Sequence, residues 1–141
     1  MDKTMLKNHH LLVSELKDLE EMIKKAKLVI DGVGAQVITD EPKGGARTSL
    51  SDKVARMVDM KDNRDELAKR VEREKLEIQK MIRTLENSRE RRVMRLRYLD
   101  LEGATWLEIA NHTGYVESYL KEVHGRALRK LFPNNILKST E

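Results

Sequence analysis

The chain contains no cysteine, which excludes disulfides, thiolate catalysis and every metal site that needs sulfur ligands. Aromatic residues make up only 4% of its 141 residues. All of them fall late in the chain: Tyr98, Trp106, Tyr115, Tyr119 and Phe132. A front part of aliphatic, Lys and Glu residues without aromatics is typical of long helices packed side by side. We therefore expect two parts with different roles.

Long apolar runs are also missing. No stretch reaches the roughly 18 consecutive apolar residues that a membrane span needs. The first ten residues carry Asp2, Lys3 and Lys7, and no apolar run behind them resembles a signal peptide. We expect a cytoplasmic protein with no membrane partner.

The positive charge is local. The formal net charge is +4, which permits a nucleic-acid partner without establishing one. Residues 88–141 hold ten basic and seven acidic side chains, whereas residues 1–87 are almost balanced with 18 and 17. Residues 89–97 alone contain five arginines and one glutamate. The second half is therefore the part that we expect to meet an anionic partner.

The front half, residues 1–87, has the pattern of two long helices. Within residues 3–30, apolar side chains recur at spacings of three and four, which predicts one helical stripe. The stripe consists of Leu12, Leu16, Leu19, Ile23, Ala26 and Ile30. The glycines after Asp31 predict the end of this helix, and residues 31–50, with Gly44 and Gly45 as the most flexible point, are predicted to form a glycine-rich loop.

The second long helix is predicted to begin after Ser49 and to run to about Glu86. Ser49 supplies a capping hydroxyl, and Asp52 stands three residues later in a capping-box pattern. Apolar residues again follow a spacing of three and four, with interruptions at Arg64 and Lys75: Met57, Met60, Leu67, Val71, Ile78, Ile82 and Leu85. The two helices form an antiparallel hairpin or part of an intermolecular bundle. One interpretation of residues 1–87 is a solvated coiled coil with a purely structural role. The functional interpretation is that residues 1–87 form a homo-oligomer.

Residues 88–141 are predicted to form a compact three-helix unit. Asn87 and Ser88 are placed to cap a helix from about Arg89 to Asp100. A capping box of the form Thr-x-x-Glu, from Thr105 to Glu108, begins a short helix through Asn111. A turn at Gly114 then leads into a helix from about Val116 to Leu131.

The spacing within this unit is that of a helix-turn-helix. Ala110 is small where two helices cross, Gly114 permits the turn, and Ile109, Leu120 and Val123 face the core. A sequence-specific DNA-binding unit is the first interpretation, and a small protein-binding module of the same shape is the second. On the second helix the outward positions are Ser118, Lys121, Glu122, Gly125 and Arg129, with Glu117 and Tyr119 at the entering end. These side chains suit base edges in the major groove.

Residues 90–132 resemble the region-4 helix-turn-helix of bacterial sigma factors. The resemblance lies in Glu-Arg-Arg-Val-Met-Arg-Leu-Arg-Tyr-Leu, Trp-Leu-Glu-Ile-Ala and His-Gly-Arg-Ala-Leu-Arg-Lys-Leu-Phe. The whole chain, with its two-helix front and glycine-rich joint, resembles small phage-encoded late-gene transcription regulators of the RinA/ArpU type. This resemblance implies an all-α fold, binding to promoter DNA in a bacterial host cell, and contact with host RNA polymerase.

The sigma-like pattern places the base-reading residues at Glu117, Ser118, Tyr119, Lys121 and Glu122. The sequence departs from that pattern in having fewer arginines there, so the DNA site should differ. It also has Val116 where a capping hydroxyl is usual. A sigma factor proper needs a promoter-opening domain, which 141 residues with this front half do not supply.

Six basic side chains are predicted to contact DNA phosphates, which gives affinity without sequence information. They are Arg89, Arg91, Arg92, Arg95, Arg126 and Lys130. A solvated helix face is the alternative interpretation of each. We expect Arg97 to pair with an acid inside the unit and Trp106 to belong to the core.

Enzyme interpretations have little support. His9, His10, His112 and His124 have no carboxylate or second histidine at helical ligand spacing, so they are interpreted as surface or satisfied histidines. We expect no catalytic residue, no metal site and no cofactor. Besides transcription regulation, a DNA-packaging protein of the small terminase type and a helical adaptor that binds a protein instead of DNA stay open.

Overall fold

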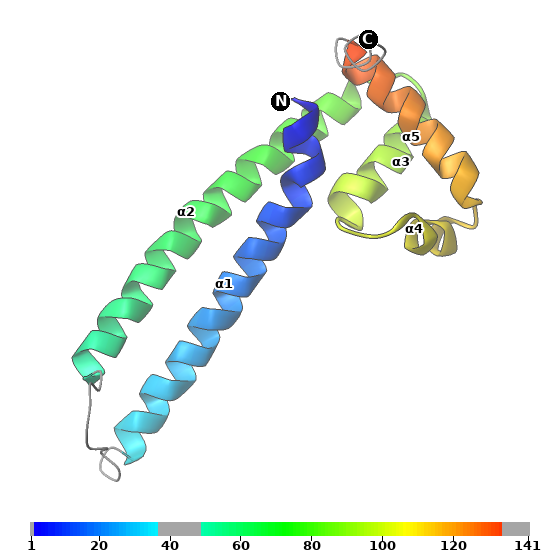
Figure 1. Ribbon diagram of the computed structural model, residues 1–141. Helices are drawn as coiled ribbons and strands as arrows, with labels where there is room; N and C mark the ends of the chain where they lie inside the picture. Colours follow the sequence, from blue (N-terminus) through cyan, green and yellow to red (C-terminus); the bar gives the residue numbers. More distant parts are fainter. Residues whose placement is uncertain (1, 37–48, 134–141) are drawn as a thin grey trace. The chain divides into compact units, whose positions relative to one another are not determined.

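The computed structural model describes residues 2–36 and 49–133, and this part of the chain is all-helical, as predicted. Two long helices, α1 (Lys3–Gln36) and α2 (Leu50–Arg83), are followed by α3 (Ser88–Arg95), a π-helical turn η1 (Leu96–Asp100), α4 (Trp106–Thr113) and α5 (Glu117–Leu131) (Figure 1). The predicted single helix over residues 89–100 is thus continuous, but its last turn is widened. In that turn the Leu101 N–H donates to the Leu96 carbonyl five residues earlier, at 2.8 Å.

The helix α1 is longer than predicted. It runs through Asp31, Gly32 and Gly34 to Gln36, so the expected loop over residues 31–50 is wrong for its first six positions. A glycine in a helix costs only about 1 kcal/mol, and near it Ala26, Val29 and Ile30 line a common cavity with residues of α2. The helix α1 therefore continues through both glycines instead of ending at Asp31. Gly44 and Gly45 lie outside the described residues.

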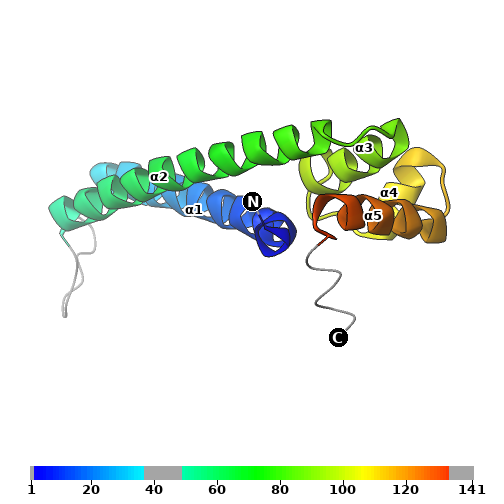
Figure 2. The same ribbon diagram turned by 90° about the horizontal axis from the view of Figure 1, so that it is seen from above.

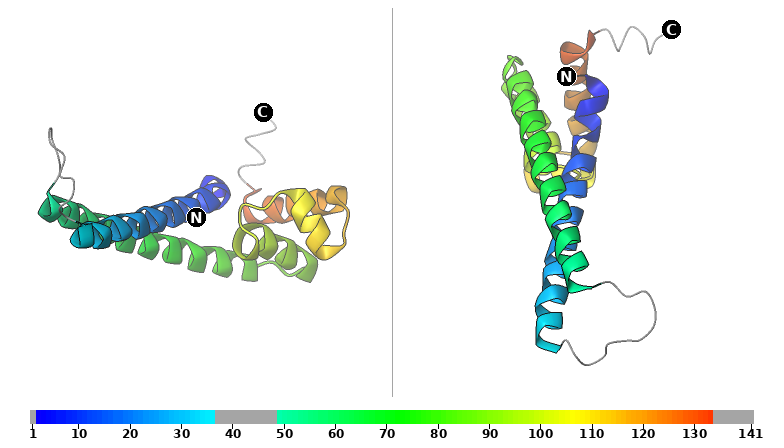
Figure 3. Two further views of the ribbon diagram at one scale, coloured as in Figure 1. Left: turned by 90° about the horizontal axis from the view of Figure 1, so that it is seen from below. Right: turned by 90° about the vertical axis from the view of Figure 1, so that its left-hand side faces the viewer.

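The helix α2 begins as predicted. The Ser49 hydroxyl accepts a hydrogen bond from the Asp52 backbone N–H at 3.1 Å, which satisfies one of the free donors of the first turn. The helix ends at Arg83, three residues before the predicted end. Within residues 13–70, α1 and α2 lie side by side and run in opposite directions (Figure 3). The predicted stripe of α1 is half-buried or buried throughout.

The chain divides into two compact units, and the division differs from the predicted boundary near Asn87. We call residues 13–70 the hairpin unit, and residues 1–12 together with 71–141 the head unit. The first turns of α1 and the last turns of α2 belong to the head unit because their apolar residues share its core. One cluster joins residues from α1, α2, α3, η1 and α5: Leu6, Ile78, Ile82, Leu85, Met94, Tyr98, Ala127, Leu128 and Phe132.

A second cluster forms the core beneath α4 and α5. It is made of Val93, Leu96, Ile109, Leu120 and Val123. Trp106, Ala110 and Tyr119 pack against it, and α5 packs on both α3 and α4 (Figure 2). Ile109, Leu120 and Val123, which were predicted to face the core, therefore do so. Because the two clusters together use most of one side of α5, the opposite side of that helix is left to solvent.

Candidate nucleic-acid interface

The start of α4 is fixed by the predicted capping box. The Glu108 N–H donates to Thr105 Oγ1 at 3.2 Å, and the Thr105 N–H donates to Glu108 Oε1 at 3.1 Å. The Thr105 hydroxyl also donates to Glu108 Oε1, at 3.1 Å. The two hydrogen bonds that the exposed Glu108 carboxylate accepts, from the Thr105 N–H and from its hydroxyl, lower the pKa of this carboxyl. Glu108 is thus a capping residue, as predicted.

The turn between α4 and α5 depends on Gly114. Its φ of 84° lies in the left-handed region, and its N–H closes α4 on the Ala110 carbonyl at 2.8 Å. After the turn, Val116 precedes α5 without a side-chain cap, as the sequence indicated. The first backbone N–H groups of α5 therefore receive no hydrogen bond from the side chain at position 116.

The two sides of α5 differ sharply. Leu120 and Val123 are fully buried, whereas Ser118, Lys121 and Glu122 are exposed. These three belong to the five predicted base-reading residues. Arg129, one turn beyond Gly125, is also exposed, and its Nη1 lies 3.5 Å from the place that a Cβ on Gly125 would occupy. A guanidinium thus folds back over the small residue on the outer face of α5.

The other two predicted base-reading residues, Glu117 and Tyr119, are half-buried. The Tyr119 ring packs against the second core cluster and lies 5.2 Å from the Tyr115 ring, centroid to centroid. Its hydroxyl accepts a long hydrogen bond from Arg89 Nη1 at 3.4 Å. Tyr119 therefore connects α5 to the first turn of α3.

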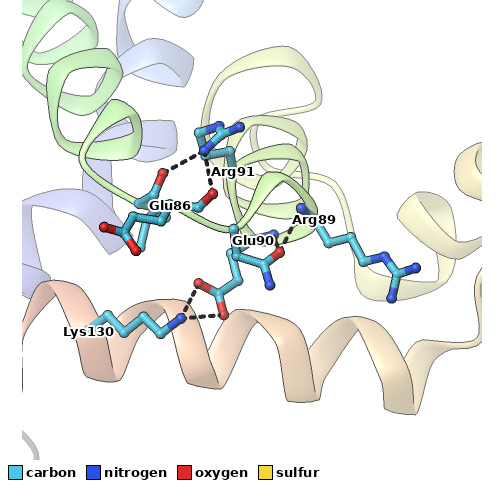
Figure 4. Close-up of polar contacts among 7 residues, drawn as sticks. Glu86, Arg89, Glu90, Arg91 and Lys130 are labelled. Atoms are coloured by element: carbon cyan, nitrogen blue, oxygen red, sulfur yellow. Dashed lines mark hydrogen bonds and ion pairs between the residues drawn. The ribbon is translucent and has the colours of Figure 1, made fainter.

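Two of the six predicted phosphate contacts are engaged inside the protein. Arg91 Nη1 donates to the carbonyls of Leu85 and Glu86 at 2.7 and 2.9 Å, close to the end of α2. Lys130 Nζ reaches from α5 to Glu90 on α3 and lies 2.9 and 3.0 Å from its two carboxylate oxygens (Figure 4). Because Glu90 is 1% exposed, Lys130 neutralises a buried charge.

Three of the remaining candidates share one face of α3. Arg89, Arg92 and Arg95 are exposed and stand three residues apart, which places them on adjoining turns. Arg95 Nε lies 3.8 Å from Asp100 Oδ2, a loose pair whose side chains are both more than half exposed. Arg126 differs, since its Nε is buried with no hydrogen-bond partner among the described residues. The structure thus groups half of the predicted set on one exposed face of α3.

Arg97 was predicted to pair with an acid, but its partners are a backbone carbonyl and an aromatic ring. Its Nη1 donates to the Ala104 carbonyl at 2.6 Å, and its guanidinium carbon lies 4.4 Å from the centre of the Trp106 ring. Trp106 packs against the second core cluster, as predicted. A carbonyl and an aromatic face hold the guanidinium in a fixed place.

His124 packs between two aromatic rings, those of Tyr98 and Trp106. Its ring stacks on Tyr98, whose hydroxyl lies 2.6 Å from His124 Nε2. Burial lowers the pKa of His124 to about 4, with further lowering by the positive charges of Arg97, Lys7 and Lys3. Tyr98 is also buried, which raises the pKa of its phenol.

Sequence reasoning missed two buried polar pairs, Glu90 with Lys130 and His9 with Glu74. His9 is 1% exposed, and its Nδ1 lies 3.0 Å from Glu74 Oε1 across the α1–α2 seam. Helical spacing does not show such pairs because their members are 40 and 65 residues apart. A signal was present for one of them, since Glu74 stands next to the interruption of the apolar stripe at Lys75, three residues after Val71.

No group of three or more potential metal ligands of the His, Cys, Asp and Glu types lies together in the described ranges. Among those ranges, no helix has the length and apolar character needed to cross a membrane. A family model described as "Protein of unknown function (DUF1492)" matches residues 33–130. No curated protein and no solved structure matches the chain.

Proposed function

Since the chain belongs to the DUF1492 family, whose description assigns no function, we propose from its own residues that it is a sequence-specific double-stranded-DNA-binding transcription regulator. The observation that carries this proposal is the division of α5. Its inner side is fully buried at Leu120 and Val123, and its outer side presents Ser118, Lys121 and Glu122. A helix held in this way by a tight turn suits insertion into a major groove.

The exposed side chains of α5 have the chemistry of base recognition. Lys121 suits guanine O6 and N7, Glu122 suits the cytosine amino group, and Ser118 suits either kind of edge. Arg129 extends the same face toward the end of the helix. We place Tyr119 and Glu117 at the edge of the contact, because both are half-buried.

Phosphate contacts are assigned to the exposed face of α3. Arg89, Arg92 and Arg95 are aligned on that face and add positive charge without base specificity. We leave Arg91 and Lys130 out of this set, because a pair of carbonyls and a buried carboxylate hold them. Arg126, with a buried Nε, is also left out.

The regulatory role rests on the resemblance of residues 90–132 to sigma region 4. We infer a phage late-gene activator that acts with host RNA polymerase in the cytoplasm of a bacterial cell. In this proposal, α5 reads a promoter element, and the chain recruits the polymerase instead of opening the DNA itself.

We further propose that the protein is a homo-oligomer formed through its front half. In the hairpin unit, exposed apolar residues follow helical spacing on each helix. Met22 and Val29 stand seven residues apart on α1, and Leu50, Val54 and Val58 stand four apart on α2. Such stripes favour a further helix pair as partner, and a second copy of the hairpin supplies one.

The oligomer has a direct test. Sedimentation equilibrium of the full chain at micromolar concentration should give a dimer or a larger assembly. Replacing Val54 and Val58 with Lys should shift it to a monomer, whereas Asp62→Lys, also exposed on α2, should leave it assembled. A wild-type monomer would refute the oligomer, and a closed ring would favour a packaging protein over a regulator.

A protein-binding adaptor is the second candidate, and one observation favours it. Tyr115 and Val116 are exposed, the latter by 65%, and they line a surface cavity of about 490 Å³ with Arg89, Gly114 and Tyr119. Exposed apolar groups of this kind also suit a protein surface. This candidate uses the turn before α5 instead of the outer face of α5.

The experiment that separates the two candidates is selection of bound sequences from a random duplex library, followed by affinity measurements at several salt concentrations. We expect one enriched motif. The double variant Lys121→Ala, Glu122→Ala should weaken binding to that motif about 10- to 1,000-fold and leave binding to random DNA nearly unchanged. Arg92→Ala should weaken both alike and lower the salt slope by about one unit.

Lys69→Ala is the matched control, because Lys69 is an exposed lysine of the hairpin unit. It should change neither motif binding nor the salt slope. Absence of any enriched motif, or unchanged motif binding in the double variant, would count against base reading by α5. Loss of polymerase binding in Val116→Lys with intact DNA binding would assign the turn to a protein partner.

A further inference from the structure

A cavity of about 310 Å³ lies within the head unit, away from the side chains assigned to DNA. Its volume is at the lower end of the range of pockets that hold small molecules. It is formed by the first turns of α1, by η1 and the segment after it, by α4 and by α5. The side chains that matter to its chemistry are Lys7, His10, Arg97, Tyr98, Trp106 and His124.

The lining of this cavity is positive. It includes the ammonium of Lys7 and the guanidinium of Arg97, and among the described residues that line it there is no carboxylate. The acid Glu102 is not among the lining residues, and its Oε2 lies 3.9 Å from His9 Nε2, beyond hydrogen-bond distance. Glu74 is held by His9. The two cations thus face the cavity without a lining acid to balance them.

Arg97 is fixed in position before any ligand is present. One N–H donates to the Ala104 carbonyl at 2.6 Å, and the guanidinium lies on the Trp106 ring. An arginine carries five N–H donors in a planar fork, so donors are left after the bond to Ala104. A guanidinium held by a carbonyl and a ring, with its charge not neutralised by either, is suited to a bidentate anion.

The state of His124 reports the same positive field. Burial and the charges of Arg97, Lys7 and Lys3 lower the pKa of His124 to about 4. The ring is therefore neutral near pH 7, and its Nε2 is hydrogen-bonded to the Tyr98 hydroxyl at 2.6 Å. A neutral hydrogen-bonded pair at the wall leaves Lys7 and Arg97 to set the charge of the cavity.

We propose that this cavity binds a small phosphorylated compound, with Lys7 and Arg97 on the phosphate group and the Trp106 and Tyr98 rings along the remainder. Phosphate matches the guanidinium fork and carries close to two negative charges at pH 7. The volume of the cavity leaves room for more than the phosphate group alone. The proposal is independent of the DNA-binding function, because it uses none of the side chains assigned to DNA.

The test uses the natural reporter of the cavity. Trp106 is the single tryptophan of the chain, so its fluorescence reports this site in the full-length protein. Titration at pH 7 with inorganic phosphate, and with glycerol phosphate as a phosphate monoester, should give saturable changes, the monoester binding more tightly. Sodium chloride at matched ionic strength should give no saturable change.

Variants decide whether the response belongs to the cavity. Lys7 is exposed, so Lys7→Gln should fold and should raise the dissociation constant about tenfold or more, as expected for the loss of a charge-assisted contact. Lys17→Gln, an exposed lysine of the same helix in the hairpin unit, should bind like the wild type. Equal weakening in both variants would overturn the proposal.

A second measurement follows the His124 ring by NMR. A bound phosphate favours the charged imidazolium, so the pKa of His124 should rise above its ligand-free value of about 4 when glycerol phosphate saturates the site. An unchanged pKa, or a chloride titration equal to that with phosphate, would overturn the proposal. A response to duplex DNA with none to either phosphate compound would also overturn it, since the phosphate would then be that of DNA.

Discussion

The head unit and the hairpin unit each contain part of α1 and part of α2, yet they bury their apolar residues very differently. In the head unit, Ile109, Leu120 and Val123 are completely buried. In the described residues of the hairpin unit, only Val13 and Ile23 reach the buried class, while Leu28 is 67% exposed. Two helices side by side cover only one stripe each, whereas the head unit surrounds α5 with neighbours.

This difference indicates that apolar burial contributes more to the free energy of unfolding in the head unit than in the hairpin unit. A helix pair of this kind gains less from burial than a core closed on several sides. The hairpin unit therefore gains less stability from its own burial than the head unit, which packs α5 against several neighbours.

The largest difference should appear on truncation of a core residue. Leu120→Ala in the head unit should lower the free energy of unfolding by about 2–5 kcal/mol, because the fully enclosed site leaves a cavity. Ile23→Ala, at the buried seam of the hairpin unit, should cost about 1–2 kcal/mol, because the open surroundings relax. Urea unfolding measures both losses. Trp106 fluorescence follows the head unit, and circular dichroism follows all helices. Equal losses would remove the distinction.

The next difference concerns pH. All four histidines belong to the head unit and none to residues 13–70. The pKa of His124 is about 4 in the folded head unit and near 6.5 in the unfolded chain. The folded state therefore binds fewer protons between these values, and its stability falls as the pH drops from about 7 toward 4, by at most about 3 kcal/mol.

The variant His124→Gln isolates this contribution. Its head unit should lose less stability than the wild type between pH 7 and pH 5, measured by urea unfolding with Trp106 fluorescence. The carboxylates and the other histidines contribute equally to both proteins, so the difference between them belongs to His124. Parallel pH curves for the two proteins would show that the histidine is not buried in a positive field.

Local signals in the sequence predicted most of the helices and their ends. The Ser49 cap, the Thr105 capping box and the turn at Gly114 were found because each depends on residues no more than a few positions apart. The apolar stripes likewise identified the buried sides of both long helices. These features need no knowledge of the tertiary structure.

Contacts between distant segments could not be predicted in the same way. Leu6 and Ile78 belong to the same core cluster as residues that follow Asn87 in the chain. No local sequence pattern predicts these contacts. Arg91 and Lys130 are predicted phosphate contacts from their charge alone, because the sequence does not show the partners that they have inside the protein. The length of α1 was underestimated because Gly32 and Gly34 predict a helix end, whereas a glycine inside a helix costs only about 1 kcal/mol and α1 continues to Gln36.

A smaller difference concerns ion pairs. Lys130→Ala leaves the buried Glu90 carboxylate without its cation, so the head unit should lose about 1–2 kcal/mol, less than for a fully buried pair because Lys130 is half exposed. Asp65→Ala removes the exposed pair of Arg64 and Asp65 in the hairpin unit and should change stability by less than about 0.5 kcal/mol. Urea unfolding of both variants measures the contrast. A larger loss for Asp65→Ala than for Lys130→Ala would contradict the greater stabilisation that we expect from the pair of Glu90 and Lys130.

The smallest effects, of opposite sign, are expected at two glycines. Gly32 is helical in α1, and a Cβ there meets no atom within 4 Å, so Gly32→Ala should stabilise the hairpin unit by about 0.5–1 kcal/mol. Gly114 has the same open space but a φ of 84°, so Gly114→Ala should destabilise the head unit by about 1–2 kcal/mol. Unfolding curves by circular dichroism and Trp106 fluorescence measure both. Because space is equal at the two sites, only backbone conformation separates them, and a neutral Gly32→Ala would mean that α1 ends near Asp31 after all.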